Sequence, residues 1–197
     1  MISRTMTLCL ACALAAACAR DDAGNAADGN QAAANAAVPE AAEQARTSIG
    51  EAVDNSVDHA TFHQMLQTAG IAGTLSGVGP YTVFAPTQAA FEAMPEEARA
   101  RLTSEEQRER LIGVLSHHIV PGTVTAQDLT AAIDRGTSGR AELATVTGAN
   151  LSLFREGDAI LIGDGGGGRA RISRADQIHT NGVVHSIDTV LMPNGGE

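Results

Sequence analysis

The side chains best suited to chemistry in this sequence are its histidines, His59, His63, His117, His118, His179 and His185. His59 and His63 lie four residues apart in a stretch with helical periodicity, so they can share one helix face. A zinc site of that kind needs the pattern His-Glu-x-x-His and a third ligand, and neither occurs here. We therefore expect surface or partly buried helix histidines and no metal site.

The adjacent pair His117 and His118 allows two interpretations. A buried imidazole must satisfy both ring nitrogens, so His118 can serve the fold through hydrogen bonds. Alternatively, the pair can serve a small-ligand carrier or an enzyme. A deep pocket that holds both rings together with carboxylates would favour the second interpretation, and a filled core with a buried His118 would disfavour it.

Other patterns associated with catalysis are incomplete. Four glycines between Asp164 and Arg169 could line a phosphate site, but no Gly-Lys-Ser/Thr follows them and no helix is predicted there, so we expect a hairpin tip. No Gly-x-Ser-x-Gly elbow occurs, and the acids Asp128, Asp134 and Asp188 form no recognisable pair. We expect no catalytic residue and no cofactor.

The charge and composition narrow the range of partners. The 197 residues include 23 acidic residues against 13 arginines and no lysine, for a net charge of −10. This acidic balance argues against nucleic-acid binding. Aromatic residues make up only 3% and include no Trp, and we place Tyr81 and the phenylalanines in the core. A broad polar contact is therefore expected rather than a groove that stacks sugar rings.

The N-terminus has the features of an export signal. Residues 1–17 combine a short basic start with an apolar run from Met6 to Ala17, too short to span a bilayer. The run ends in Leu14-Ala15-Ala16-Ala17-Cys18, which resembles a bacterial lipobox. We expect a lipid on Cys18, and Ala19 after it indicates the outer membrane or cell surface. The alternative is ordinary cleavage at Ala15-Ala16-Ala17, which gives a periplasmic or secreted protein.

Residues 18–48 consist mainly of Ala, Asn, Asp, Gly and Glu and cannot bury a core, so we interpret them as a disordered tether after the lipidated Cys18. The only other cysteines, Cys9 and Cys12, precede Cys18, which leaves residues 49–194 without a disulfide. The chain is thus predicted to be an anchor, a tether and one displayed domain.

The displayed domain changes its periodicity along the chain. Helical spacing predicts helices at residues 60–69, 88–94 and 125–133, with Thr87 and Thr125 as the N-caps of the last two. A longer helix is predicted to open at a capping box of Thr103 with Glu106. Alternating apolar residues predict strands at 81–85, 143–146, 151–154, 159–162, 171–173 and 183–191. Helices followed by strands indicate an α+β fold.

Three ordered motifs resemble the signatures of the fasciclin (FAS1) domain: Tyr81–Phe91, Leu115–Gly122 and Asn181–Pro193. The resemblance implies a β-wedge of about seven strands with a cluster of short helices. It also implies structural roles for the motif residues Thr82, Phe84, Pro86, Thr87, Pro121, Gly122, Asn181, Gly182, His185 and Asp188.

The resemblance also suggests candidate contact residues. His118 aligns with the regular histidine of the family, and His117 replaces a tyrosine implicated in adhesion by some animal members. Asp176 aligns with the aspartate of an Asp-Ile pair linked to integrin binding, but Gln177 replaces the isoleucine. His117, His118 and Asp176 are therefore candidates for interaction, although these departures weaken any transfer of a receptor role.

The function implied by the resemblance is that of a non-enzymatic, monomeric adhesion domain. Its expected partners are proteins or polysaccharides of the envelope or extracellular matrix, with the membrane reached only through the lipid anchor. One alternative is a small-ligand carrier or enzyme that uses the His117/His118 region. Another is a structural envelope lipoprotein without a dedicated ligand.

Overall fold

The computed structural model describes residues 46–103 and 107–193, so the signal segment, Cys18 and most of the tether lie outside the described residues. The prediction that the domain covers residues 49–194 therefore remains a prediction. The helices are α2 (Ile49–Asn55), η1 (Val57–His59), α3 (Ala60–Ala69), α4 (Ala72–Leu75), α5 (Gln88–Glu92), α6 (Glu96–Thr103), α7 (Arg108–His117), α8 (Ala126–Arg135) and η3 (Thr137–Gly139). None of the described helices is long and apolar enough to cross a membrane.

The seven strands form one sheet in the order β2-β1-β7-β6-β5-β4-β3. The strands are β1 (Tyr81–Pro86), β2 (Ile119–Pro121), β3 (Arg140–Ala144), β4 (Asn150–Glu156), β5 (Ala159–Gly163), β6 (Arg169–His179) and β7 (Gly182–Ile187). Strands β1 and β7 are parallel neighbours, whereas all other pairs are antiparallel. Two of the sequence motifs therefore lie side by side in the sheet.

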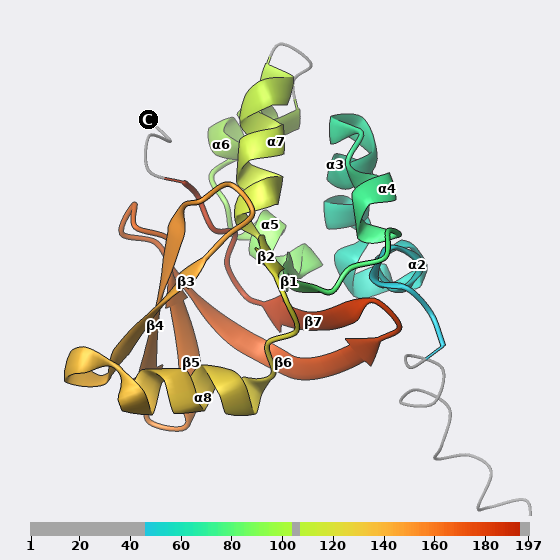
Figure 1. Ribbon diagram of the computed structural model, residues 1–197. Helices are drawn as coiled ribbons and strands as arrows, with labels where there is room; N and C mark the ends of the chain where they lie inside the picture. The colour runs from blue at the N-terminus through green and yellow to red at the C-terminus, as the bar shows by residue number, and fades with distance from the viewer. Residues whose placement is uncertain (1–45, 104–106, 194–197) are drawn as a thin grey trace, which may run out of the picture. The chain divides into compact units, whose positions relative to one another are not determined.

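The sheet curls until its two edge strands approach each other. The N–H of Val146, just after β3, donates to the carbonyl of Ile119 in β2 at 2.9 Å. The curled sheet has α8 across one end, while α2, α5 and α7 contact β7, β1 and β2, respectively, on another side (Figure 1). This arrangement confirms the predicted α+β class and the seven-stranded wedge.

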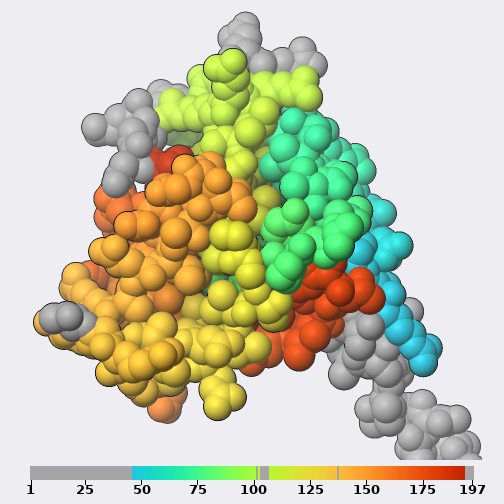
Figure 2. All heavy atoms as spheres, viewed as in Figure 1, coloured from blue at the N-terminus to red at the C-terminus, as the bar shows by residue number. Residues whose placement is uncertain are grey.

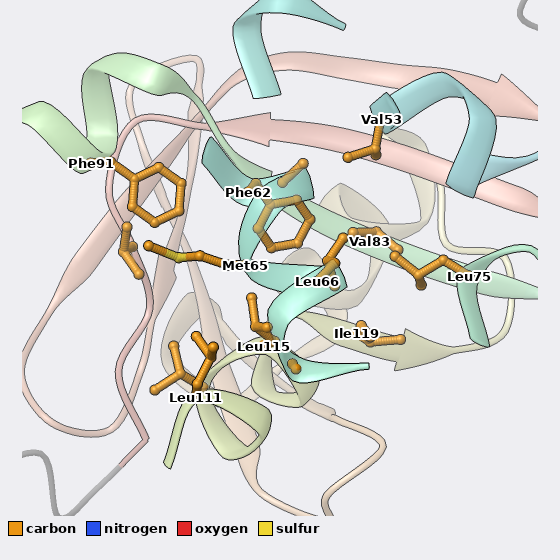
Figure 3. Close-up of a cluster of buried hydrophobic side chains, with 14 of the residues drawn as sticks. Val53, Phe62, Met65, Leu66, Leu75, Val83, Phe91, Leu111, Leu115 and Ile119 are labelled. Carbon is orange, nitrogen blue, oxygen red and sulfur yellow. The ribbon is translucent and has the colours of Figure 1, made fainter. Parts of the chain in front are cut away.

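One apolar cluster joins the helices of the N-terminal half to β1. Phe62, Met65 and Leu66 project from α3 at helical spacing and pack with Leu111 and Leu115 of α7 (Figure 3). Val83 of β1 completes this cluster and is fully buried. Since apolar burial contributes about 25 cal/mol per Å², these side chains fix α3 and α7 against the sheet.

A second apolar cluster lies between α8 and the C-terminal strands. Leu129 and Ile133 of α8 are buried against Leu151, Leu153 and Ile162 of the sheet. In the space-filling view, the yellow atoms of α8 lie directly against the orange atoms of the strands. The green and teal atoms of α3 and α4 lie to the right of both (Figure 2). The alternating pattern of β4 thus places every second residue in this core.

The structure also corrects several predicted element ends. Thr103 ends α6 instead of opening the next helix, α7 begins at Arg108, and the predicted partner Glu106 lies outside the described residues. Strand β6 is eleven residues long, although only residues 171–173, near its start, were predicted. By contrast, the predicted caps Thr87 and Thr125 both accept the hydrogen bonds expected of an N-cap.

Candidate functional site

His118 lies fully buried at the C-terminal end of α7 and uses both ring nitrogens. Nδ1 donates to the carbonyl of Val114 at 2.8 Å, and Nε2 accepts the N–H of Leu191 at 3.1 Å. These partners set the neutral tautomer with its proton on Nδ1. Burial lowers the pKa of His118 to about 4, so the ring is neutral at pH 7 and serves the fold.

The neighbouring His117 has a contrasting environment. Its side chain is only 1% exposed, yet neither ring nitrogen has a hydrogen-bond partner among the described residues. Burial lowers its pKa, and the negative charge and the backbone carbonyl of Asp164 oppose this effect, although that carbonyl does not reach the ring in hydrogen-bond geometry. Unsatisfied buried nitrogens cost stability, so His117 is a weak point of the core.

The interaction role predicted for the pair remains a prediction. Both rings are enclosed by protein, at 1% and 0% exposure, so in this structure neither offers a surface to a partner. His118 is buried in a filled core, which disfavours a catalytic or small-ligand site at this pair.

Asp176 connects β6, β7 and α8. Its Oδ1 accepts the N–H of Ala126, the first residue of α8, at 2.7 Å. The N–H of Asp176 donates to Nδ1 of His185 at 3.2 Å. Nε2 of His185 donates to the carbonyl of Val124 at 2.8 Å. Asp176 has φ of +57° within a bulge of β6, a conformation that Asp tolerates better than most residues. Its contacts to α8 and His185 are structural; its predicted role as a partner contact is untested.

Several motif residues join segments that are distant in sequence. Phe84 stacks on the ring of His185 with centroids 5.5 Å apart. The hydroxyl of Thr82 donates to the carbonyl of Gly122 and accepts the N–H of Val124. Gly122, which follows the exposed Pro121, has φ of +97°, which favours glycine.

The closing motif is tied to the helices and to β6 in the same way. Asn181 accepts the N–H of Ile49 and donates to the carbonyls of Leu75 and Gly77. A side chain at Gly182 would clash with the carbonyl of Tyr81. At the far end of the motif, Asp188 accepts the N–H of Arg171.

One buried polar pair has no signal in the sequence. Nε2 of His59 lies 3.1 Å from the hydroxyl of Ser186, and Nδ1 lies 3.0 Å from the carbonyl of Pro86. Gln177 donates to the same hydroxyl at 2.9 Å. Burial lowers the pKa of His59. Ser186 is 5% exposed and lines neither of the hollows described below. The hydrogen bonds of His59 therefore hold η1 against β1 and β7.

Two hollows in the described part of the chain lie away from His117 and His118. One, of about 430 Å³, lies beside the first half of α8 and is lined by Thr130, Arg155 and Arg171 among others. The other, of about 200 Å³, lies beside Glu51, Asp54 and His63. Nowhere in the described ranges do three or more His, Cys, Asp or Glu side chains come together as a metal site.

The curled seven-stranded sheet with its helical cluster is the architecture of the fasciclin domain, and the chain belongs to the fasciclin family. The family model matches residues 57–193. The fold is similar to that of the FAS1 domain pair from the insect cell adhesion molecule Fasciclin I, with a TM-score of 0.67 at 17% identity over 76% of this chain and 52% of that one.

Relatives occur in bacteria and in animals. The chain is 31% identical over 159 residues to protein sll1483 of Synechocystis sp., covering 81% of each chain. It is 34% identical over 127 residues to the cell surface glycolipoprotein MPB83 of Mycobacterium bovis, covering 62% of this chain and 48% of that one. It is 31% identical over 137 residues to the transforming growth factor-beta-induced protein ig-h3 of Sus scrofa, covering 70% of this chain and 18% of that one. The chain therefore spans half or less of the last two relatives.

Proposed function

We propose that this protein is a non-enzymatic adhesion module displayed on the cell surface or secreted, which contacts proteins or polysaccharides of the envelope or matrix. The observation that carries the proposal is the fasciclin domain itself, which spans residues 57–193. Proteins with this domain include a cell surface glycolipoprotein and a cell adhesion molecule by name.

The interior of the domain supports adhesion over the small-ligand alternative. The imidazoles of His59, His118 and His185 are occupied by hydrogen bonds within the fold, and burial lowers the pKa of each. These three rings have no free lone pair for a ligand. The ring of His117 makes no such hydrogen bond, but it is only 1% exposed and so has no access to a substrate. The outer surface is then the part of the domain available for binding.

We also propose the anchor and tether predicted from the sequence. A lipid on Cys18 and the segment to residue 48 would hold the domain at the outer membrane or cell surface as a monomer, and the lipoprotein relative supports this arrangement.

The adhesion proposal is tested with the full chain. A strain that lacks the protein, the same strain carrying the full chain, and one carrying the Asn181→Asp variant are compared for aggregation and for retention on surfaces coated with the exopolysaccharide of the producing cells. We expect the full chain to restore retention and the variant, designed to weaken the fold, to restore less. Equal retention with and without the protein would refute the adhesion function.

A further inference from the structure

One face of the β3–β6 half of the sheet carries three arginines around Phe154, which was predicted to lie in the core but is half-exposed on the outer face. Directly opposed residues in neighbouring strands share a face. The pairings Arg140 with Phe154, Phe154 with Leu161, and Leu161 with Arg171 therefore form one row across four strands. Arg169 lies two residues before Arg171 in β6, on the same face. The opposite face holds the buried core.

The aromatic ring positions two of the guanidinium groups. Arg169 places its guanidinium carbon 5.0 Å from the centroid of the Phe154 ring, and Arg140 places its own at 6.0 Å. Cation–π contacts of this kind hold a guanidinium by its plane and leave its N–H edge available. Two arginines from distant strands are thus oriented beside one ring.

The three arginines are exposed and lack ion pairs. The only arginine–carboxylate pair in the described part of the chain joins Arg155 to Asp134, on the α8 side of the sheet. Of the acids near the arginine row, Glu142 accepts a hydrogen bond from Asn150, and Asp188 accepts the backbone N–H of Arg171. Glu156 lies on the same face at the end of β4. Free guanidinium groups therefore concentrate on one face of a chain whose net charge is −10.

Between the arginines, the Phe154 ring is half-exposed, whereas Leu161 and Gly163 are buried. Gly163 lies in the next row, where a side chain would crowd the Phe154 ring at 3.3 Å. Asp164 accepts the N–H groups of Gly166 and Gly168 and so shapes the turn that leads into Arg169. A ligand can thus contact the half-exposed ring of Phe154 with exposed arginines on either side.

We propose that this arginine face, made of Arg140, Phe154, Arg169 and Arg171, binds a carboxylate-bearing polysaccharide. The inference rests on the proposed adhesion function and names its ligand class. Guanidinium groups pair with carboxylates in bidentate geometry, and the half-exposed ring of Phe154 offers apolar surface to the C–H face of a sugar. A single-stranded nucleic acid fits less well, because it needs aromatic rings on which successive bases stack, and this face has one ring.

Binding of the full chain is measured on surfaces coated with polygalacturonate, with neutral dextran, and with single-stranded DNA. The test variants are Arg140→Gln combined with Arg169→Gln, and Phe154→Leu. The matched control is Arg155→Gln, which removes one arginine from the opposite face next to Phe154. We expect saturable binding to polygalacturonate alone, a loss of about tenfold in affinity for the double variant, and little change for the control.

The outcomes separate this inference from the function on which it rests. Equal losses for the double variant and for Arg155→Gln would refute the arginine face, as would equal binding to dextran or stronger binding to DNA. A third outcome is that the full chain does not bind polygalacturonate, while cells carrying the Arg140→Gln/Arg169→Gln variant aggregate like cells carrying the natural chain. The adhesion function then stands, and the proposed ligand class is wrong. Thermal unfolding of each variant confirms that the fold is intact.

Discussion

The ring of His118 holds the backbone of Leu191, whose N–H it accepts at 3.1 Å. Through the same ring, the carbonyl of Val114 in the last turn of α7 gains a partner that the helix itself does not supply. The helix end and the segment that follows β7 are therefore fixed by one side chain. His117, one residue earlier, has no such partner.

Substitution of His118 by leucine and of His117 by leucine is expected to change the free energy of unfolding in opposite directions. His118→Leu leaves two buried backbone groups unpaired and should lower the free energy of unfolding by about 2–3 kcal/mol. His117→Leu removes two unsatisfied nitrogens and should raise it by about 1 kcal/mol. Urea unfolding of both variants checks this, and the same sign for both would contradict the hydrogen-bond assignment.

Stability is expected to fall as the pH drops below about 6.5. Burial lowers the pKa of His118 to about 4 in the folded state, so between these values the unfolded chain binds a proton that the folded chain rejects. The loss from His118 alone approaches about 3 kcal/mol near pH 4. His59, His117 and His185 are shifted in the same direction.

Urea midpoints measured between pH 7.5 and pH 4 test this dependence. The His118→Gln variant lacks the titrating group and should show a shallower decline than the natural chain. A constant free energy of unfolding across this range would show that the histidines can take up protons without disrupting the core.

Asn181→Asp is expected to cost about 2–4 kcal/mol. The change removes the two N–H donors to Leu75 and Gly77 and sets a carboxylate against their carbonyl oxygens. The exposed Asn150 makes one hydrogen bond, to Glu142, and Asn150→Ala serves as the control with an expected change under about 0.5 kcal/mol. Similar losses in both variants by thermal unfolding would argue against a special role for Asn181.

At Asp176, asparagine should be tolerated and alanine should not. Asparagine keeps an oxygen acceptor for the Ala126 N–H and accepts the φ of +57°. Asp176→Ala loses the acceptor and strains the backbone, with an expected cost of about 1–2 kcal/mol. If both variants unfold like the natural chain but bind cells less well, Asp176 is a partner contact, as the sequence resemblance suggested.

The anchor is tested by Cys18→Ser. We expect the substitution to move the protein from the membrane fraction to the soluble fraction, because the acylated sulfur is the only proposed membrane contact. Conversion of Ala19 to Asp, which leaves the thiol in place, serves as the comparison. Unchanged fractionation of Cys18→Ser would refute lipidation.

Local sequence patterns predicted the helices and strands whose apolar residues follow a regular spacing. Helix α3 and strands β4 and β5 were predicted because their apolar residues follow one period, and Thr87 and Thr125 because capping depends on neighbours three residues away. The length of strand β6 was underestimated because many of its exposed residues are charged, and a prediction from hydrophobic alternation does not recognise such residues as part of a strand.

Long-range relationships were outside the reach of local patterns. The parallel pairing of β1 with β7 joins Tyr81 to Gly182, and no periodicity reports which strands become neighbours. The same holds for the pair His59 and Ser186, since a serine in a strand carries no sign of its partner. The family motifs indicated the fold, but the environments of His117 and His118 required coordinates.

The position of β7 has a consequence for how the chain is made. β7 is the last of the described strands to be synthesised, yet it lies between β1 and β6 in the sheet. While the chain emerges from a ribosome, β1 has no parallel partner until about a hundred further residues have followed. The nascent domain therefore stays open until the closing motif appears, which exposes it to proteases but also keeps it able to thread through a secretion channel.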